Sequence, residues 1–384
     1  MSATDPISYY AHQQITEEDI AAVVSVLRSD YLTQGPKVAE FEEALAAYVG
    51  ARYAVAVSNG TTALYLACWA ALGDKTHCQE CGYGRMGHVV TSPLSFLATA
   101  NAAQLCGAMV GFEDVDPLTG NIACYTRDAD LLVPVHLAGR ACQMPTHDGS
   151  GLSPMVIEDA CHALGAMDFD NCSRVGSCAH SLATCFSFHP VKPITTGEGG
   201  AVMTNDGSFA KEIRNLRDHG REDGLMMRLG TNARMTDIQA ALGISQLKRC
   251  DEMLSARGHW AWTYINELCH MPDLMIPQPP RDALDFVLFD KSTSWHLYPV
   301  RIKNGRRDEI KAKLNDQGIG AQVHYSPIIP LHPYYQSRYR YRPGQFPHAE
   351  AWAAEALSLP LHAGMNDEDV GRVVSALRKA LREE

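Results

Sequence analysis

The sequence predicts an α/β fold: a large domain with a mostly parallel sheet between two layers of helices, followed by a smaller α+β domain. The first observation is a series of short apolar runs between residues 53 and 204, which alternate with helical segments as buried parallel strands do. The second is a proline-rich stretch at 275–280, after which a new set of elements begins. We therefore expect a large domain over residues 1–250 and a small one over 251–384.

Two helices are expected before the sheet begins. Thr16 followed by Asp19 is a capping-box pattern at the start of the first helix, which ends at Ser29. The second helix is amphipathic and ends at Gly50. The turn between them, residues 30–36, carries polar and aromatic side chains that are suited to face a ligand.

The remaining elements follow from hydrophobic periodicity. In the large domain we expect strands at 53–57, 88–91, 108–112, 131–135, 155–158, 183–188 and 201–204, and helices at 62–72 and 98–105. A helix over 234–249 continues as a long helical region to Leu268. In the small domain we expect strands at 295–302 and 320–324, and helices at 307–317 and 367–382.

Composition narrows the class of protein. A chain of 384 residues with 46% apolar content fits two soluble domains, and a net charge of -11 argues against a nucleic-acid or anionic-membrane partner. No apolar run approaches the roughly 20 residues of a membrane helix, and residues 1–6 lack the pattern of a secretion signal. We therefore expect a cytoplasmic protein whose twelve cysteines are free thiols.

Lys192 lies in an unusual setting, between an apolar run at 182–186 and a glycine-rich turn at 197–200. An amine among apolar groups loses its proton more easily than one in water, and the neutral amine can form a Schiff base with an aldehyde. The alternative is a lysine whose stem packs on the surface while its charge reaches solvent. Two other motifs bear on the choice.

The first motif is Ser-Asn-Gly-Thr-Thr at 58–62, between an expected strand and the start of a helix. Free backbone N–H groups, the helix dipole and the hydroxyls of Thr61 and Thr62 make such a junction an anion site. The alternative is that glycine and threonine serve only as turn and cap.

The second motif is Glu-Asp-Ala-Cys-His at 158–162. Asp159 follows a strand, so it lies at the carboxyl end, where open α/β sheets bind ligands. A carboxylate there can hold a protonated ring nitrogen, and His162 can reach another group of the same ring. The alternative is a capping aspartate and a core histidine.

Together the three motifs point to one cofactor. Pyridoxal 5′-phosphate needs a phosphate cup, an acid for its pyridine nitrogen and a lysine for its aldehyde. All three occur here at the ends of successive strands, which is far more specific than any one of them. The sequence therefore predicts a pyridoxal-phosphate enzyme.

Four segments, 58–64, 158–165, 187–200 and 230–243, resemble the DegT/DnrJ family of nucleotide-sugar aminotransferases, and the resemblance extends over nearly the whole chain. It implies the pyridoxal-phosphate-dependent transferase fold of type I, which is aspartate aminotransferase-like. It also implies a homodimer whose active sites are shared across the interface.

The resemblance implies a role for each matching position. Lys192 would form the Schiff base and carry the catalytic proton, Asp159 would keep the pyridine nitrogen protonated, and His162 would lie near the phenolic oxygen. Other cofactor contacts would come from Gly60, Thr61, Thr62 and Ser187 at the phosphate, Phe96 on the ring face and Asn232 of the neighbouring subunit. For Phe96 the alternative is a core aromatic. The walls of the sugar-nucleotide site would be Tyr9, Asp30, Tyr31, Leu32, Thr33, Gln322, Val323, His324 and Tyr325.

Within the family, segments 187–192, 31–36, 296–299 and 322–325 are most similar to the branch that serves pseudaminic-acid biosynthesis. This implies transfer of the amino group of L-glutamate, which leaves as 2-oxoglutarate, to C4 of a UDP-linked 4-keto-6-deoxy-N-acetylhexosamine. The alternatives are another nucleotide ketosugar, of the perosamine or bacillosamine type, amination at C3, or a non-catalytic sensor that kept the fold. A dehydratase of the family is disfavoured because such enzymes typically replace the lysine that is present at position 192.

Residues 77–88 depart from the family pattern. They contain Cys78 and Cys81 in a Cys-x-x-Cys arrangement with two histidines nearby, which could hold zinc. Structural zinc sites usually pair two such knuckles, and the sequence has no second one. A surface loop with free thiols is therefore the favoured interpretation, and we expect no metal cofactor.

Overall fold

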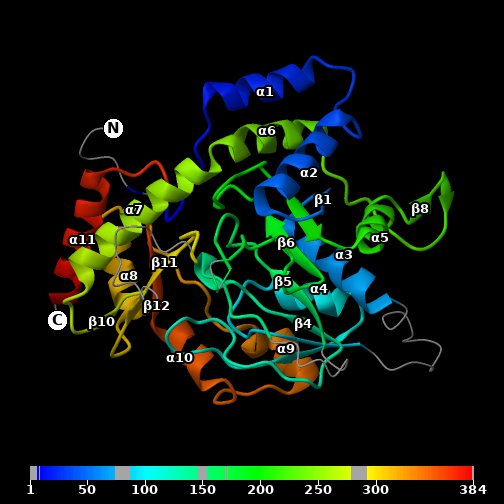
Figure 1. The fold of residues 1–384 in the computed structure, drawn as a ribbon. Coiled ribbons are helices and arrows are strands. Elements are labelled where there is room, and N and C mark those ends of the chain that lie inside the picture. The colour runs from blue at the N-terminus through cyan, green and yellow to red at the C-terminus, as the bar shows by residue number, and fades with distance from the viewer. Residues whose placement is uncertain are drawn as a thin grey trace.

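The computed structural model describes residues 7, 9–73, 87–145, 154–168, 170, 172–277 and 292–382. The Cys78 and Cys81 pair lies outside the described residues. Figure 1 shows a large part built around a sheet and a smaller part, at the left of the view, where the C-terminal helix packs beside a long helix. The expected boundary between two domains at residue 250 stays a prediction.

The main sheet of the described residues has seven strands in the order β1-β7-β6-β5-β4-β2-β3. They are β1 (Tyr53–Val57), β2 (His88–Thr91), β3 (Met109–Phe112), β4 (Leu131–Val133), β5 (Met155–Asp159), β6 (Ala183–Ser187) and β7 (Gly200–Thr204). β7 pairs antiparallel with β1 and β6, whereas the other neighbouring strands pair in parallel. The prediction of a mostly parallel sheet is confirmed.

Helices cover both faces of this sheet. Both faces of β1 are therefore buried, which explains why the strand is apolar. Val55 and Val57 point into one core, whereas Ala54 and Ala56 point into the other, as alternate residues of a strand must. The first core contains residues of α3 (Gly60–Leu72), α4 (Ala98–Leu105) and α5 (Gly207–Arg217). The second contains residues of α2 (Pro36–Val49) and α6 (Asp237–Lys248).

The first helix, α1 (Glu17–Leu27), has the predicted capping box between Thr16 and Asp19. Asp19 also ties α1 to α6, because its Oδ2 accepts hydrogen bonds from Gln246 Nε2 at 2.6 Å and Arg249 Nη2 at 2.7 Å. The turn that follows α1 is thereby held beside the start of α6, where Asp237 N donates to the carbonyl of Leu32 at 3.0 Å.

The smaller part contains a three-stranded antiparallel sheet in the order β10-β11-β12. Its elements are α7 (Cys250–Leu268), β10 (Leu274–Met275), β11 (Tyr298–Ile302), α8 (Arg307–Asp316), β12 (Ala356–Leu359) and α11 (Asp367–Arg382). Their apolar faces share one core, in which Tyr264, Tyr298 and Leu377 are fully buried. The predicted helix at 367–382 is confirmed.

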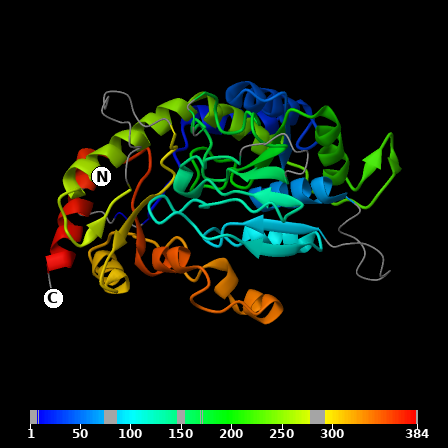
Figure 2. The same cartoon turned by 60° about the horizontal axis from the view of Figure 1, so that its bottom comes forward.

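One predicted strand is wrong. Residues 320–324 make a single isolated bridge, between Gln322 and Ser358, and the neighbouring Ile319 makes another with Ile7, so no ladder forms. The chain then runs back to the main sheet through α9 (Pro333–Tyr339) and α10 (Pro347–Glu355), whose Tyr335 and Trp352 join the core of α3 and α4. Figure 2 shows these elements, in orange, below the sheet.

A short hairpin, β8 (Arg221–Glu222) and β9 (Leu225–Met226), projects beyond α5 at the edge of the molecule (Figures 1 and 2). Among the described helices, none combines the length and the apolar character that a bilayer crossing requires.

Candidate active site

Lys192 lies in the turn after β6, and backbone hydrogen bonds fix that turn. Lys192 N donates to the carbonyl of His189 at 2.9 Å, and Phe188 N donates to the carbonyl of Gly199 at 2.8 Å. Burial lowers the pKa of Lys192 to about 8. With this pKa about a tenth of the amine is neutral at pH 7, far more than for an ordinary lysine, which favours the role of a nucleophilic amine over that of a solvated charge.

Asp159 is the last residue of β5, and two groups orient its carboxylate. Thr99 of α4 donates its hydroxyl to Asp159 Oδ2 at 2.6 Å, and Cys161 N donates to Oδ1 at 3.2 Å. The hydroxyls of Ser95 and Thr99 lie 2.8 Å apart, so Ser95 can donate to Thr99 while Thr99 donates to Asp159. These hydrogen bonds fix the orientation of the carboxylate at the end of β5.

A buried pair lies behind Asp159. His136 Nδ1 accepts the N–H of Cys142 at 2.9 Å, so the ring proton is on Nε2, which donates to Glu158 Oε2 at 2.8 Å. Burial alone would raise the pKa of Glu158, but its hydrogen bonds to His136, Ser181 and Thr184 outweigh that effect and lower it. His136 N also donates to the carbonyl of Asp159 at 3.1 Å. The pair therefore fixes the strand end that carries Asp159.

Three buried or half-buried histidines lie near the lysine, and burial favours the neutral form of each. His296 Nε2 lies 3.5 Å from Lys192 Nζ, and the rings of His162 and His296 are 4.3 Å apart. Burial lowers the pKa of His162 and His296 well below the ordinary value, and that of His324 to about 4. Neutral imidazoles next to Lys192 can share a proton with it without adding charge to the site.

The start of α3 has the features expected of a phosphate-binding site. Asn59 caps the helix by accepting the N–H of Thr62 at 2.8 Å, while the N–H groups of Gly60 and Thr61 have no partner within the helix. A Cβ at Gly60 would lie 2.6 Å from Ser187 Cβ. Glycine is therefore required for the helix start to approach Ser187 this closely.

The structure brings most of the predicted cofactor residues together. Gly60 lies against Ser187 and Cys161, and Tyr325 links Phe96 to His162: its ring is 6.1 Å from that of Phe96, and its hydroxyl is 3.2 Å from His162 Nε2. His324 packs against Tyr10, with 4.8 Å between ring centroids.

Other predicted residues have no recorded contact with Lys192 or Asp159 among the described residues. Asn232 is exposed and bridges to Asp218, and Tyr9 is 65% exposed. Residues 30–33 are exposed beside the start of α6. Their assigned roles stay predictions.

Sequence reasoning missed Thr99, His136 and His296. Each contacts a motif residue that is distant in sequence. The separations are 60 positions from Thr99 to Asp159, 22 from His136 to Glu158 and 104 from His296 to Lys192. His296 lay in the recognised segment 296–299, which was the one available signal for it.

The residues present fit pyridoxal phosphate. Lys192 offers a reactive amine, Asp159 an oriented carboxylate, and Gly60 with Ser187 a cradle that a larger residue would fill. Within the described ranges, the buried Nδ1 atoms of His162 and His296 have no hydrogen-bond partner. Unpaired buried polar atoms of this kind are expected next to a site that binds a polar ligand. The described residues contain no cluster that would hold a metal ion.

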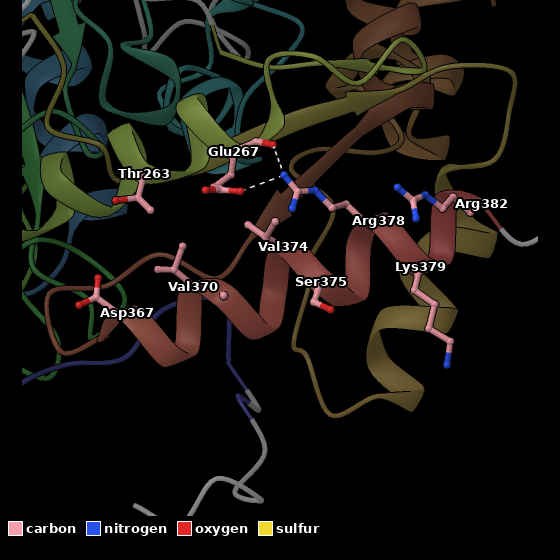
Figure 3. Close-up of a pocket in the computed structure, with 10 residues that line it drawn as sticks. Thr263, Glu267, Asp367, Val370, Val374, Ser375, Arg378, Lys379 and Arg382 are labelled. Atoms are coloured by element: carbon pink, nitrogen blue, oxygen red, sulfur yellow. Dashed lines mark hydrogen bonds and ion pairs between the residues drawn. The ribbon is translucent and has the colours of Figure 1, made fainter.

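A surface groove between α7 and α11 is unrelated to this site. Figure 3 shows it lined by both helices, with Arg378 paired to Glu267 at 2.9 Å. None of the residues predicted for cofactor or substrate lines it.

Comparison with known proteins gives a consistent result. The model of the DegT/DnrJ/EryC1/StrS aminotransferase family matches residues 13–378. The spore coat polysaccharide biosynthesis protein SpsC of Bacillus subtilis is 36% identical, covering 97% of each chain. A UDP-4-amino-4,6-dideoxy-N-acetyl-beta-L-altrosamine transaminase of Campylobacter jejuni is 36% identical, covering 96% of each chain.

Among solved structures, the chain is similar to Helicobacter pylori PseC, an aminotransferase involved in the biosynthesis of pseudoaminic acid. The TM-score is 0.85 at 32% identity, covering 97% of this chain and 98% of that one. The family assignment, the fold and the fitted site agree. The chain therefore belongs to the DegT/DnrJ/EryC1/StrS aminotransferase family and is a pyridoxal-phosphate-dependent enzyme.

Proposed function

We propose that this enzyme transfers the amino group of L-glutamate to C4 of a UDP-linked 4-keto-6-deoxy-N-acetylhexosamine, as in pseudaminic-acid-type nonulosonate biosynthesis. The observation that carries the reaction class is the half-buried Lys192, whose pKa is lowered, within electrostatic reach of the oriented Asp159. The names of the Campylobacter and Helicobacter relatives support the choice of substrate.

Asp159, Thr99 and the start of α3 would bind and orient the cofactor. When bound, pyridoxal phosphate supplies an electron sink that stabilises charge on the carbon next to nitrogen. The Asp159 carboxylate would pair with the ring nitrogen of the cofactor, and the hydrogen bond from Thr99 would hold that carboxylate in position. The N–H groups at the start of α3 hold the phosphate.

Proton transfer is the task of Lys192. Its neutral amine removes a proton from the α-carbon of glutamate and, in the second half of the reaction, delivers a proton to C4 of the sugar. His296 lies 3.5 Å from Nζ and holds the amine in place between the two steps. The burial of the site excludes bulk water from this exchange.

We also propose that the enzyme acts in the cytoplasm as a homodimer in which Asn232 reaches the site of the other subunit. The exposed apolar tip that precedes it, at Leu225, Met226, Met227 and Leu229, supports this proposal because such a patch favours burial against another protein.

The test is product identification. The enzyme is incubated with glutamate and 4-ketosugars linked to UDP, GDP or dTDP, and the products are analysed by NMR. We expect amination at C4 of the UDP-N-acetyl sugar and loss of about 10²-fold or more in rate for Lys192→Ala. Efficient turnover of the GDP sugar alone would establish a perosamine-type activity instead. A colourless protein without response to glutamate would indicate a non-catalytic binding module.

A further inference from the structure

A small cavity lies beside Lys192, and apart from Lys192 the proposed reaction uses none of the residues that line it. Lys192 and Arg257 both line it, together with His12, Gln14, Thr195 and Gln246. Its free volume of about 10 Å³ is room for a single water-sized species. The question is which species the lining favours.

Arg257, on α7, is the distinctive residue of this cavity. Its side chain is 2% exposed, and its Nη1 donates to the carbonyls of Trp295, His296 and Leu361 at 3.4, 3.4 and 3.0 Å. Its Nε has no hydrogen-bond partner in the described part of the chain. Burial lowers the pKa of Arg257 to about 10, which leaves it cationic at neutral pH.

Arg257 also lacks a counter-charge among the described residues. Arg301 is buried to a similar degree, 8% exposed, yet its Nη2 is paired with Glu355 at 2.7 Å. No ion pair of Arg257 with a described carboxylate is recorded, and the groups that act on its charge are Cys250 and Tyr10. A buried cation without a partner is costly, so an anion gains unusually much by binding next to it.

The rest of the lining strengthens the preference for an anion. No acidic residue lines the cavity, whereas Lys192 adds a second basic group. Gln246 is engaged, since its Nε2 donates to the carbonyl of Gln14 at 2.8 Å and to Asp19, and Asp19 is itself paired with Arg249 at 2.7 Å. The unsatisfied donor is therefore that of Arg257.

We propose that this cavity is a binding site for one small inorganic anion of the halide class, held by Arg257 next to Lys192. The anion supplies the counter-charge that the protein does not provide for Arg257. It also places a negative charge beside the amine of Lys192. The behaviour of that amine should therefore depend on the chloride concentration.

The direct test is crystallographic. Crystals of the holoenzyme are soaked in sodium bromide, and anomalous data are collected at the bromine absorption edge. We expect a peak in the cavity lined by Arg257 and Lys192 for the wild type and for Arg301→Met, and no peak for Arg257→Met. Ordered water without an anomalous peak in the wild type, or a peak that persists in Arg257→Met, would overturn the proposal.

A solution experiment provides an independent measurement. The Tm of the holoenzyme is compared in sodium bromide and in sodium gluconate at equal ionic strength. A halide at ten times its Kd is expected to raise Tm by about 2 °C in the wild type and in Arg301→Met. Arg257→Met should lose the difference, and Arg257→Lys, which keeps the cation if the methionine variant does not fold, should retain part of it. An equal Tm in both salts for the wild type would contradict the proposal.

Discussion

At the scale of single residues, the site depends on groups that hold the catalytic side chains as much as on those side chains themselves. Asp159 was identifiable from its place after a strand, because strand ends are where this class of sheet binds ligands. Thr99 was not, because only the folded chain brings α4 against the end of β5. The same is true of His296, whose ring is 3.5 Å from Lys192 Nζ.

Thr99→Val tests the role of the Thr99 hydroxyl. The variant keeps the side-chain shape but removes the hydrogen bond to Asp159 Oδ2, which is 2.6 Å long. A hydrogen bond to a charged group contributes about 1.5–3 kcal/mol, so we expect kcat/KM to fall about 10- to 100-fold and the Kd for the cofactor to rise. Steady-state kinetics and cofactor titration measure both. Ser95→Ala, one step further from Asp159, should have a smaller effect, and equal activity of Thr99→Val and wild type would contradict this role.

The pH dependence of cofactor attachment tests the setting of Lys192. Burial depresses the pKa of Lys192 to about 8, so half of the amine is neutral at that pH and about nine tenths of it one pH unit higher. The rate at which apoenzyme acquires near-visible absorbance after mixing with pyridoxal phosphate should therefore be half-maximal near pH 8 and level off above about pH 9. Nα-acetyl-lysine serves as the control, because its unperturbed ε-amine is only half neutral at about pH 10.4 and so keeps gaining neutral form through pH 10. A protein rate that follows the control through pH 10 would show an ordinary lysine.

At the scale of elements, periodicity predicted the strands of the main sheet well because buried parallel strands are short continuous apolar runs. It failed at residues 320–324. The segment has an alternating pattern, but no neighbouring strand pairs with it along its length. Gln322 meets Ser358 in a single bridge, and His324 Nδ1 instead contacts the hydroxyl of Ser358 at 2.9 Å. Strand pairing depends on partners distant in sequence, which a local pattern does not contain.

Gly60→Ala tests the close approach of α3 to β6. The added Cβ would lie 2.6 Å from Ser187 Cβ, so the helix start must shift and its N–H groups leave their place. We expect the Kd for pyridoxal phosphate to rise about tenfold or more, as when one good hydrogen bond to a charged group is lost. Equilibrium titration with the cofactor measures this.

The matched control is Gly371→Ala on α11, where an added Cβ meets no atom within 4 Å. Cofactor affinity should be unchanged there, and the free energy of unfolding should stay equal or increase by about 0.5–1 kcal/mol because alanine favours a helix. Equal cofactor affinities for Gly60→Ala and Gly371→Ala would show that the approach of α3 is not required.

At the scale of the whole molecule, the hairpin of β8 and β9 is the clearest candidate for contact with a second copy. Leu225 and Met226 are each 68% exposed, and Met227 and Leu229 are 62% and 58% exposed. We expect Met226→Glu combined with Leu229→Glu to weaken the dimer, with sedimentation velocity across a concentration series as the measurement. Leu118→Glu, at a leucine that is 43% exposed and distant in sequence, is the control. A dimer unaffected by the double substitution would place the interface elsewhere.

Complementation between two inactive variants tests whether the active sites are shared. Lys192→Ala and Asn232→Ala are each expected to lose activity, because one lacks the amine and the other the contact that we propose is supplied across the interface. If each site combines Lys192 of one subunit with Asn232 of the other, a mixed dimer contains one intact site and one site that lacks both residues. Refolding the variants together in equal amounts makes half of all dimers mixed, so about a quarter of wild-type activity should return. If both residues served the same subunit's site, every site in the mixture would lack one of them and no activity would be regained. Wild-type refolded in parallel corrects for the yield of folded protein.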